Sequence, residues 1–71
     1  DGDLARALSA YDLAATDPAA PAELWRDRGL VLRRLGRNAE AAADFRRYLE
    51  RAPNADDRAM IAHYLGDSDA P

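Results

Sequence analysis

The sequence has no cysteine, no lysine and only one histidine in 71 residues. Without cysteine it has neither a disulfide framework nor a thiolate for catalysis or metal binding. It also lacks a glycine-rich phosphate loop and a nucleophile matched to a base. The single His63 has no matched pair of carboxylates, so we expect it at the edge of an apolar face rather than on a metal. These absences predict a protein that is not an enzyme and binds no cofactor.

Long apolar runs and an excess of positive charge are missing as well. No run approaches the ~20 residues that a membrane-spanning helix needs. The net charge of -3 gives no support to binding of a nucleic-acid backbone. We therefore expect neither membrane nor nucleic acid as a partner, and a cytoplasmic location is favoured. All ten basic residues are arginine and alanine is abundant, which hints at a GC-rich bacterial genome.

What the sequence does contain suits one small folded domain. Hydrophobic residues make up 48% of the chain and charged residues 32%, which is typical of a folded helical domain rather than a disordered chain. A chain of this length buries only about 60% of the surface that it exposes when unfolded. Its core is therefore expected to be thin.

The centre of the chain contains two helical patterns, at residues 22–35 and 38–51, with Gly36 supplying the turn between them. One arc of the first pattern is apolar or small and consists of Leu24, Trp25, Gly29, Val31, Leu32 and Leu35. A narrow stripe of the second consists of Ala41, Ala42, Phe45, Tyr48, Leu49 and Ala52. The pattern predicts two antiparallel helices that bury these stripes against each other. We expect Tyr48 to pack in the core with its hydroxyl at the rim.

Six residues of this region fall at the positions that define a tetratricopeptide repeat (TPR): Trp25, Gly29, Leu32, Ala41, Phe45 and Pro53. Segment 22–55 therefore resembles one complete repeat. In such a repeat a small residue stands where the two helices touch, and a proline ends the second helix. The resemblance implies an all-α, antiparallel helix-turn-helix solenoid fragment that acts as a protein-protein interaction module.

An earlier segment, residues 3–16, repeats part of this pattern. The shift that pairs Tyr11 with Phe45 also pairs Ala7 with Ala41, and it equals the length of one TPR. The segment therefore resembles the second helix of a preceding repeat, and its apolar stripe needs a neighbour. That stripe consists of Leu4, Leu8 and Tyr11. Two coverings remain open, namely a longer parent protein or a homo-oligomer that forms through this face.

After Pro53 the sequence predicts a short capping helix at residues 55–65. Asn54 would cap its start and Gly66 would stop it. Its apolar face consists of Met60, Ile61, Tyr64 and Leu65. Residues 66–71 are acidic and small, and we expect them to be frayed. The whole chain is thus expected to be a single TPR-like domain of four helices.

The TPR resemblance also places part of the helix at residues 22–35 on the concave groove of such arrays. The partner-binding candidates are Arg26, Leu30, Arg33, Arg34 and Asn54. Two guanidiniums with an apolar residue between them suit an acidic extended peptide or a terminal carboxylate, because each guanidinium donates two parallel hydrogen bonds. The alternative is that these arginines are only the solvated face of an amphipathic helix.

Arg28 departs from the family pattern, because it stands in the apolar arc where a TPR usually has leucine. Its charge needs a route to solvent, a stack on Trp25, or an acid from a neighbouring helix. Asp44 and Arg47 are expected to form only a surface pair. The run RDRGL at residues 26–30 also resembles the TPR-like tail of bacterial transglutaminase-like proteins. The alternative function is therefore a solenoid cap, an oligomerisation element or the accessory tail of a larger protein.

Overall fold

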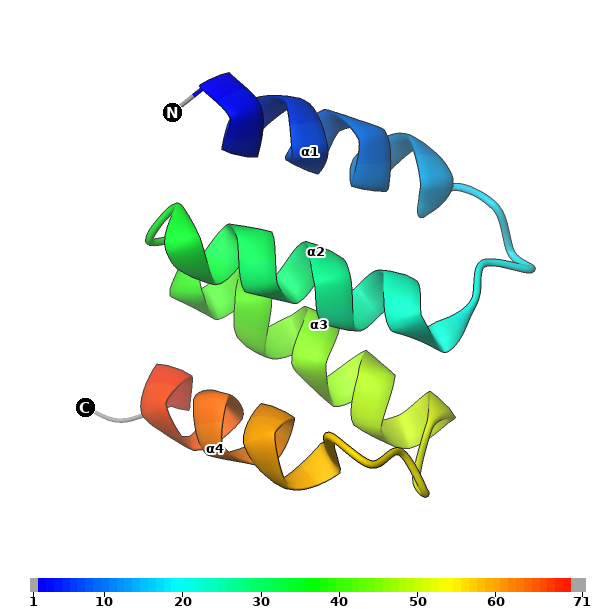
Figure 1. Ribbon diagram of the computed structural model, residues 1–71, viewed down its shortest axis with the longest axis vertical. Helices are drawn as coiled ribbons and strands as arrows, with labels where there is room; N and C mark the ends of the chain where they lie inside the picture. Colours follow the sequence, from blue (N-terminus) through cyan, green and yellow to red (C-terminus); the bar gives the residue numbers. More distant parts are fainter. Residues whose placement is uncertain (1, 70–71) are drawn as a thin grey trace.

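The computed structural model describes residues 2–69, which form four α-helices and contain no β-strand (Figure 1). The helices are α1 (Gly2–Ala14), α2 (Ala22–Arg34), α3 (Asn38–Arg51) and α4 (Arg58–Asp69). The prediction of an all-α helical-repeat fragment is confirmed. The first three helices lie close to their predicted bounds, and the fourth does not.

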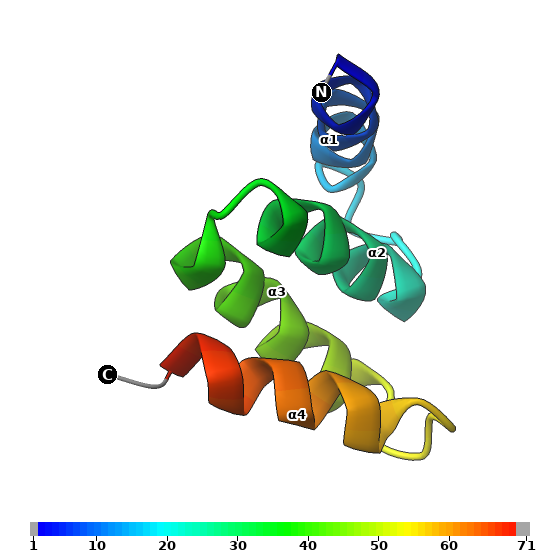
Figure 2. The same cartoon turned by 60° about the vertical axis from the view of Figure 1, so that its left-hand side comes forward.

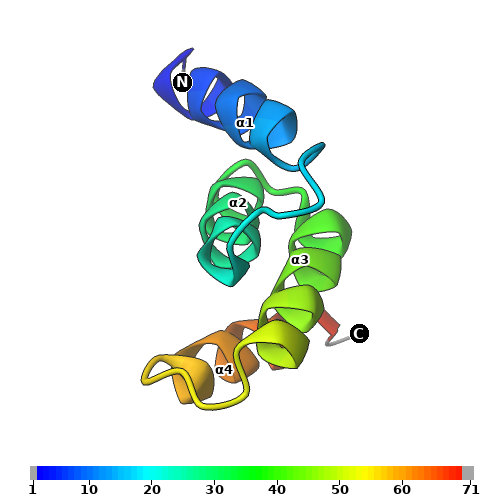
Figure 3. The ribbon, with the colours of Figure 1, turned by 90° about the vertical axis from the view of Figure 1, so that its right-hand side faces the viewer.

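Successive helices run antiparallel, and the connections alternate between the two ends of the molecule (Figure 1). Each helix packs against the next one in the chain. From the side, α2 and α4 lie on the same side of α3 (Figure 3). At the N-terminal edge α1 packs against α2 and stands away from α4 (Figure 2).

The turn between α2 and α3 has the geometry with which a helix ends at glycine. Gly36 has a φ of +79°, which residues with a β-carbon rarely adopt. The N–H of Arg37 donates to the carbonyl of Leu32 at 2.9 Å, and the N–H of Gly36 donates to the carbonyl of Arg33 at 3.1 Å. These two bonds form a Schellman motif, which satisfies carbonyls left free at the end of α2. The chain therefore reverses here and places α3 against α2.

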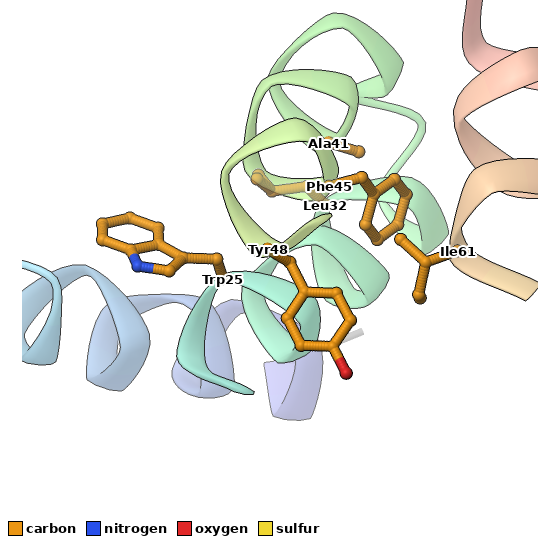
Figure 4. Packing of buried hydrophobic residues seen from close by; sticks show 6 residues of the cluster. All are labelled: Trp25, Leu32, Ala41, Phe45, Tyr48 and Ile61. Carbon is orange, nitrogen blue, oxygen red and sulfur yellow. The ribbon is translucent and has the colours of Figure 1, made fainter. Parts of the chain in front are cut away.

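The core lies where α2, α3 and α4 meet (Figure 4). Its buried members are Trp25, Leu32, Ala41, Phe45, Tyr48 and Ile61. Phe45 and Ile61 are completely buried, so α4 closes the apolar surface that α2 and α3 leave open. A β-carbon added at Gly29 would lie 2.6 Å from the ring of Phe45. Glycine is therefore needed at this position for the close approach of α3.

The start of the last helix differs from the prediction. The sequence predicted a helix from residue 55 with Asn54 as its cap, whereas α4 begins at Arg58. Two short turns come first, because the N–H of Ala55 donates to the carbonyl of Ala52 and the N–H of Arg58 donates to the carbonyl of Ala55. Asn54 therefore lies in an exposed turn and does not cap α4.

The end of the last helix also differs from the prediction. Gly66 does not stop α4, which continues to Asp69. A glycine ends a helix when it adopts a positive φ, and Gly66 does not. The segment predicted to be frayed, residues 66–71, is thus helical as far as Asp69, and residues 70–71 lie outside the described residues.

The apolar stripe of α1 is only half-buried, because α2 covers it from one side. Leu8 packs against the core cluster, whereas Leu4 and Tyr11 border a groove that is described below. Leu13 is 75% exposed on the opposite side of the helix. None of the helices within residues 2–69 has both the length and the apolar character needed to cross a membrane.

Candidate functional site

A groove of about 410 Å³ opens between α1, α2 and α4, and we call it the Arg33 groove. It is lined by Leu4, Tyr11, Asp27, Leu30, Val31, Arg33, Arg34 and Tyr64. Of the partner-binding candidates, Leu30, Arg33 and Arg34 lie in this groove. Leu4 and Tyr11 lie there too, although the sequence assigned them to a separate oligomer face. The fold therefore brings parts of the two predicted surfaces together.

Two arginines, Arg33 and Arg34, line the groove. The guanidinium carbon of Arg33 lies over the Tyr64 ring, 4.2 Å from its centre, in a cation-π contact. A guanidinium in such a contact still has N–H groups that can donate hydrogen bonds. Neither Arg33 nor Arg34 pairs with any carboxylate whose side chain is described. The groove thus carries two arginines that pair with no described carboxylate, beside Asp27, which is paired with Arg26.

Apolar side chains provide the rest of the groove. Leu30 is half-buried and rests on the core cluster, as does Tyr64. Tyr64 was predicted only as part of the apolar face of the last helix. The repeat could have revealed its second role, because a shift of one repeat length superimposes Tyr64 on Leu30. Equivalent positions of successive repeats face the same groove.

The other two partner-binding candidates do not line the Arg33 groove. Arg26 donates through Nε to Asp27 at 2.9 Å and through Nη1 to Asp57 at 3.1 Å, and its guanidinium lies 5.6 Å from the ring of Tyr48. These hydrogen bonds, the one to Asp27 most, raise the pKa of Arg26 and keep it charged. Asn54 lies in the exposed turn before α4. Arg26 is therefore already occupied within the chain.

Asp57 is the acid that joins α3 to the start of α4. The buried hydroxyl of Tyr48 donates to its carboxylate, which also accepts from Arg26. The bond from Tyr48, followed by that from Arg26, lowers the pKa of Asp57, and the same carboxylate raises the pKa of Tyr48. The sequence predicted Asp57 only as an acid in the first turn of a helix. A buried tyrosine needs a hydrogen-bond partner, and this was the available signal.

Arg28 is paired with two acids, Asp44 and Asp12. Its Nε and Nη2 donate to the two carboxylate oxygens of Asp44 at 2.7 and 2.9 Å. Asp12 of α1 accepts a third bond at 3.3 Å. The prediction of Asp44 as a surface acid was wrong, since Asp44 is only 2% exposed. Arg47 is 3.8 Å from it, but the bidentate partner comes from α2.

Three arginines cover the indole of Trp25. The guanidinium carbons of Arg28, Arg47 and Arg51 lie 5.1, 4.9 and 5.3 Å from its ring. Their contacts leave Trp25 only 6% exposed at the side of α2 that faces away from the Arg33 groove. These cations therefore stabilise the packing of α2 on α3.

A second hollow of about 490 Å³ lies between the C-terminal half of α1 and the N-terminal half of α2. It is lined by Ala10, Tyr11, Ala14, Asp17, Ala19, Ala20, Pro21, Glu23, Leu24 and Asp27. We call it the Glu23 groove. Its floor is apolar and its charged groups are all acidic, so its charge is opposite to that of the Arg33 groove. Tyr11 and Asp27 form the wall between the two.

No group of histidine, aspartate or glutamate side chains suited to a metal ion occurs in the described part of the chain. His63 lies on the exposed side of α4 with its ring 6.2 Å from that of Tyr64. Arginine and apolar side chains line the Arg33 groove, and acidic and apolar side chains line the Glu23 groove.

Comparison with known protein families gives a match over most of the chain. A family model described as tetratricopeptide repeat matches residues 1–66. A search of curated proteins and a search of solved structures each found no match. The matched range covers α1, α2, α3 and most of α4, so it includes every residue that lines either groove.

Proposed function

Because this chain belongs to the tetratricopeptide repeat family, whose members generally mediate protein-protein interaction, we propose that it binds an acidic, extended segment of a partner protein in the Arg33 groove. Arg33 and Arg34 would pair with carboxylates of that segment. Leu4, Tyr11 and Leu30 would cover its apolar side chains. The chain would therefore act by binding rather than by catalysis.

One observation carries this proposal, namely the guanidinium of Arg33, which pairs with no carboxylate among the described side chains and lies over the ring of Tyr64 beside the apolar residues of the groove. A guanidinium held on a ring loses less rotamer freedom when it binds than one that moves freely in solvent. Charge-assisted bonds to a carboxylate are about twice as strong as neutral ones. The alternative of a merely solvated helix face does not explain why these side chains converge on one groove.

Fluorescence anisotropy of a short labelled peptide of alternating glutamate and leucine tests the proposal. We expect saturable binding that weakens roughly tenfold in Arg33→Gln, since a hydrogen bond to a charged group contributes about 1.5–3 kcal/mol. Arg6→Gln is the matched control, because it removes the same charge from the exposed side of α1. Binding should also weaken with added salt.

Two results would overturn the proposal. The first is equal binding by wild type and Arg33→Gln. The second is equal binding of a peptide in which glutamine replaces every glutamate, because the guanidiniums would then contribute nothing.

A second candidate function is structural, as a solenoid cap or as the accessory tail of a larger, transglutaminase-like protein. It is favoured by His63, which stands one repeat length after Gly29. A β-carbon at Gly29 would clash with the ring of Phe45. Because α4 has histidine at the equivalent position, a further helix could not pack an aromatic ring against α4 in the way that α3 packs Phe45 against α2. Under this function α4 closes the repeat.

Self-association through Leu4, Leu8 and Tyr11 would be insensitive to salt, unlike binding through arginine.

A further inference from the structure

The two ends of the Arg33 groove carry opposite charges. Arg33 and Arg34 stand at the C-terminal end of α2, whereas Asp27 lines the same groove about two helical turns earlier. Because α1 runs antiparallel to α2, Leu4 in its first turn lies toward the arginine end and Tyr11 lies toward the aspartate end (Figure 1). The groove therefore has a positive end and a negative end, with apolar side chains along both.

Asp27 has a carboxylate oxygen that is available to a ligand. Nε of Arg26 donates to Oδ1 of Asp27 at 2.9 Å, and Oδ2 accepts no hydrogen bond from the described residues. The side chain of Asp27 is 37% exposed. Because an ionised carboxylate can accept about four hydrogen bonds, the bond from Arg26 leaves most of this capacity unused.

Arg26 does not cancel the negative charge at this end of the groove. Its Nη1 donates to Asp57 at 3.1 Å, so one guanidinium serves two carboxylates. The other group that donates to Asp57 is the hydroxyl of Tyr48, which adds no positive charge. The cluster of Arg26, Asp27 and Asp57 therefore has one more negative charge than positive, and Asp27 is the member that lines the groove.

The distance between the two ends determines which spacing of charges an extended segment needs. Asp27 and Arg34 are about 10 Å apart along the axis of α2, and Leu30 lies between them. In an extended chain, alternate side chains point to the same side, and each residue adds about 3.3 Å. Residues four positions apart are therefore on one side and about 13 Å apart, a difference of about 3 Å that a long arginine side chain can span. The residue midway between them lies over Leu30.

We propose that the segment bound in the Arg33 groove carries an acidic residue and a basic residue four positions apart, with an apolar residue midway. This inference rests on the proposed function and specifies which acidic segment the groove selects. The acid pairs with Arg33 or Arg34, and the base pairs with Asp27. A second acid at the position of the base would face the carboxylate of Asp27, so a uniformly acidic segment binds less tightly.

Three peptides that differ in one residue test this inference. The first has the sequence Ser-Glu-Ser-Leu-Ser-Lys-Ser and is capped at both ends, and the other two have glutamine or glutamate in place of the lysine. Each is also made in reversed order, because an extended segment can run along the groove in either direction, and the order that binds more tightly is used. In amide chemical-shift titrations the lysine peptide should bind roughly fivefold more tightly than the glutamine peptide, as a partly exposed ion pair allows. The glutamate peptide should bind less tightly than both.

Asp27→Asn should abolish the preference for lysine. Asparagine keeps an oxygen that can accept the hydrogen bond from Arg26, but it has no charge to attract a base. The lysine and glutamine peptides should therefore bind this variant equally, since the two changes remove the same contact. Glu23→Gln is the matched control, because it removes the same charge from an exposed position on α2 that does not line the Arg33 groove, and it should retain the preference. Thermal unfolding would check that both variants are folded.

Arg33→Gln distinguishes failure of this inference from failure of the proposed function. It should weaken the lysine and glutamine peptides by the same factor, because it removes a partner of the acid that both contain. No binding of any peptide, or binding that Arg33→Gln leaves unchanged, would overturn the proposed function and this inference with it. Equal binding of the lysine and glutamine peptides that still depends on Arg33 would overturn this inference alone. A preference for lysine that persists in Asp27→Asn would also overturn it, since another acid would then hold the base.

Discussion

At the scale of single residues, Arg28 shows how a charge is kept inside an apolar arc. Its guanidinium satisfies both oxygens of Asp44, which is buried on the facing helix, and it reaches Asp12 on a third helix. Trp25 covers one face of the same group. The bonds to Asp44 raise the pKa of Arg28, so it remains charged. Sequence spacing identifies pairs within one helix, and it gives no signal for a pair between helices.

Arg28→Leu should destabilise the fold, even though leucine is the usual residue at this position of the family. The substitution would leave Asp44 buried without its bidentate partner, and such a loss costs about 3 kcal/mol or more. Urea denaturation would measure it. The double variant Arg28→Leu, Asp44→Leu should recover most of the loss, because no buried charge remains unpaired. A single variant more stable than wild type would show that the pair is dispensable.

Gly29→Ala should also destabilise the fold, although alanine has a higher helix propensity than glycine. Alanine is favoured over glycine within a helix by about 1 kcal/mol. The new β-carbon, however, would lie 2.6 Å from the buried ring of Phe45, and overpacking of this kind costs about 1–3 kcal/mol. Gly66→Ala is the matched control, since open space surrounds that position, and it should be stabilising. Thermal unfolding of both variants would check the opposite signs.

At the scale of elements, the sequence predicted α2 and α3 well because local chemistry fixes their ends. Gly36 forms the turn that ends α2, and Pro53 follows the end of α3. At α4 the local signals were misleading. Asn54 and the acids after it predicted an early helix start, but Tyr48 and Arg26 hold the carboxylate of Asp57 and the helix begins only beyond it. The start of α4 thus depends on a contact between helices, and a local sequence pattern cannot predict such a contact.

The contact at the start of α4 should be sensitive to pH. The folded chain lowers the pKa of Asp57, so the stabilisation is complete above the usual aspartate pKa of about 4 and is lost as the pH falls through the folded value. At neutral pH, Asp57→Ala should cost about 2 kcal/mol, because the buried hydroxyl of Tyr48 loses a charged acceptor. The difference from wild type should shrink in acid.

Urea denaturation at neutral pH and at about pH 3 would measure this change. Asp56→Ala is the control, since Asp56 is the exposed neighbour in the same turn and should change stability little at either pH. A cost of Asp57→Ala that stays constant between the two pH values would contradict the role given to the ionised carboxylate.

At the scale of the whole molecule, the fold places residues of one helix on different surfaces, whereas the sequence could only assign them to that helix. The arginines of α2 point in three directions, with Arg33 in its groove, Arg26 on Asp57 and Arg28 on Asp44. The sequence predicted the repeat architecture from six positions. It could not predict which arginines are occupied, because their partners lie on other helices. The acidic Glu23 groove was missed for the same reason, since two separate elements form it.

Chemical-shift mapping tests most directly the claim that a partner binds in the Arg33 groove. Amide spectra of the labelled chain would be recorded while the alternating glutamate and leucine peptide is added. The account predicts shifts that cluster on Leu4, Leu30, Arg33 and Tyr64 and that require roughly tenfold more peptide in Arg33→Gln. Shifts that cluster instead around Arg28 and Arg47, on the face where Trp25 is covered, would contradict it.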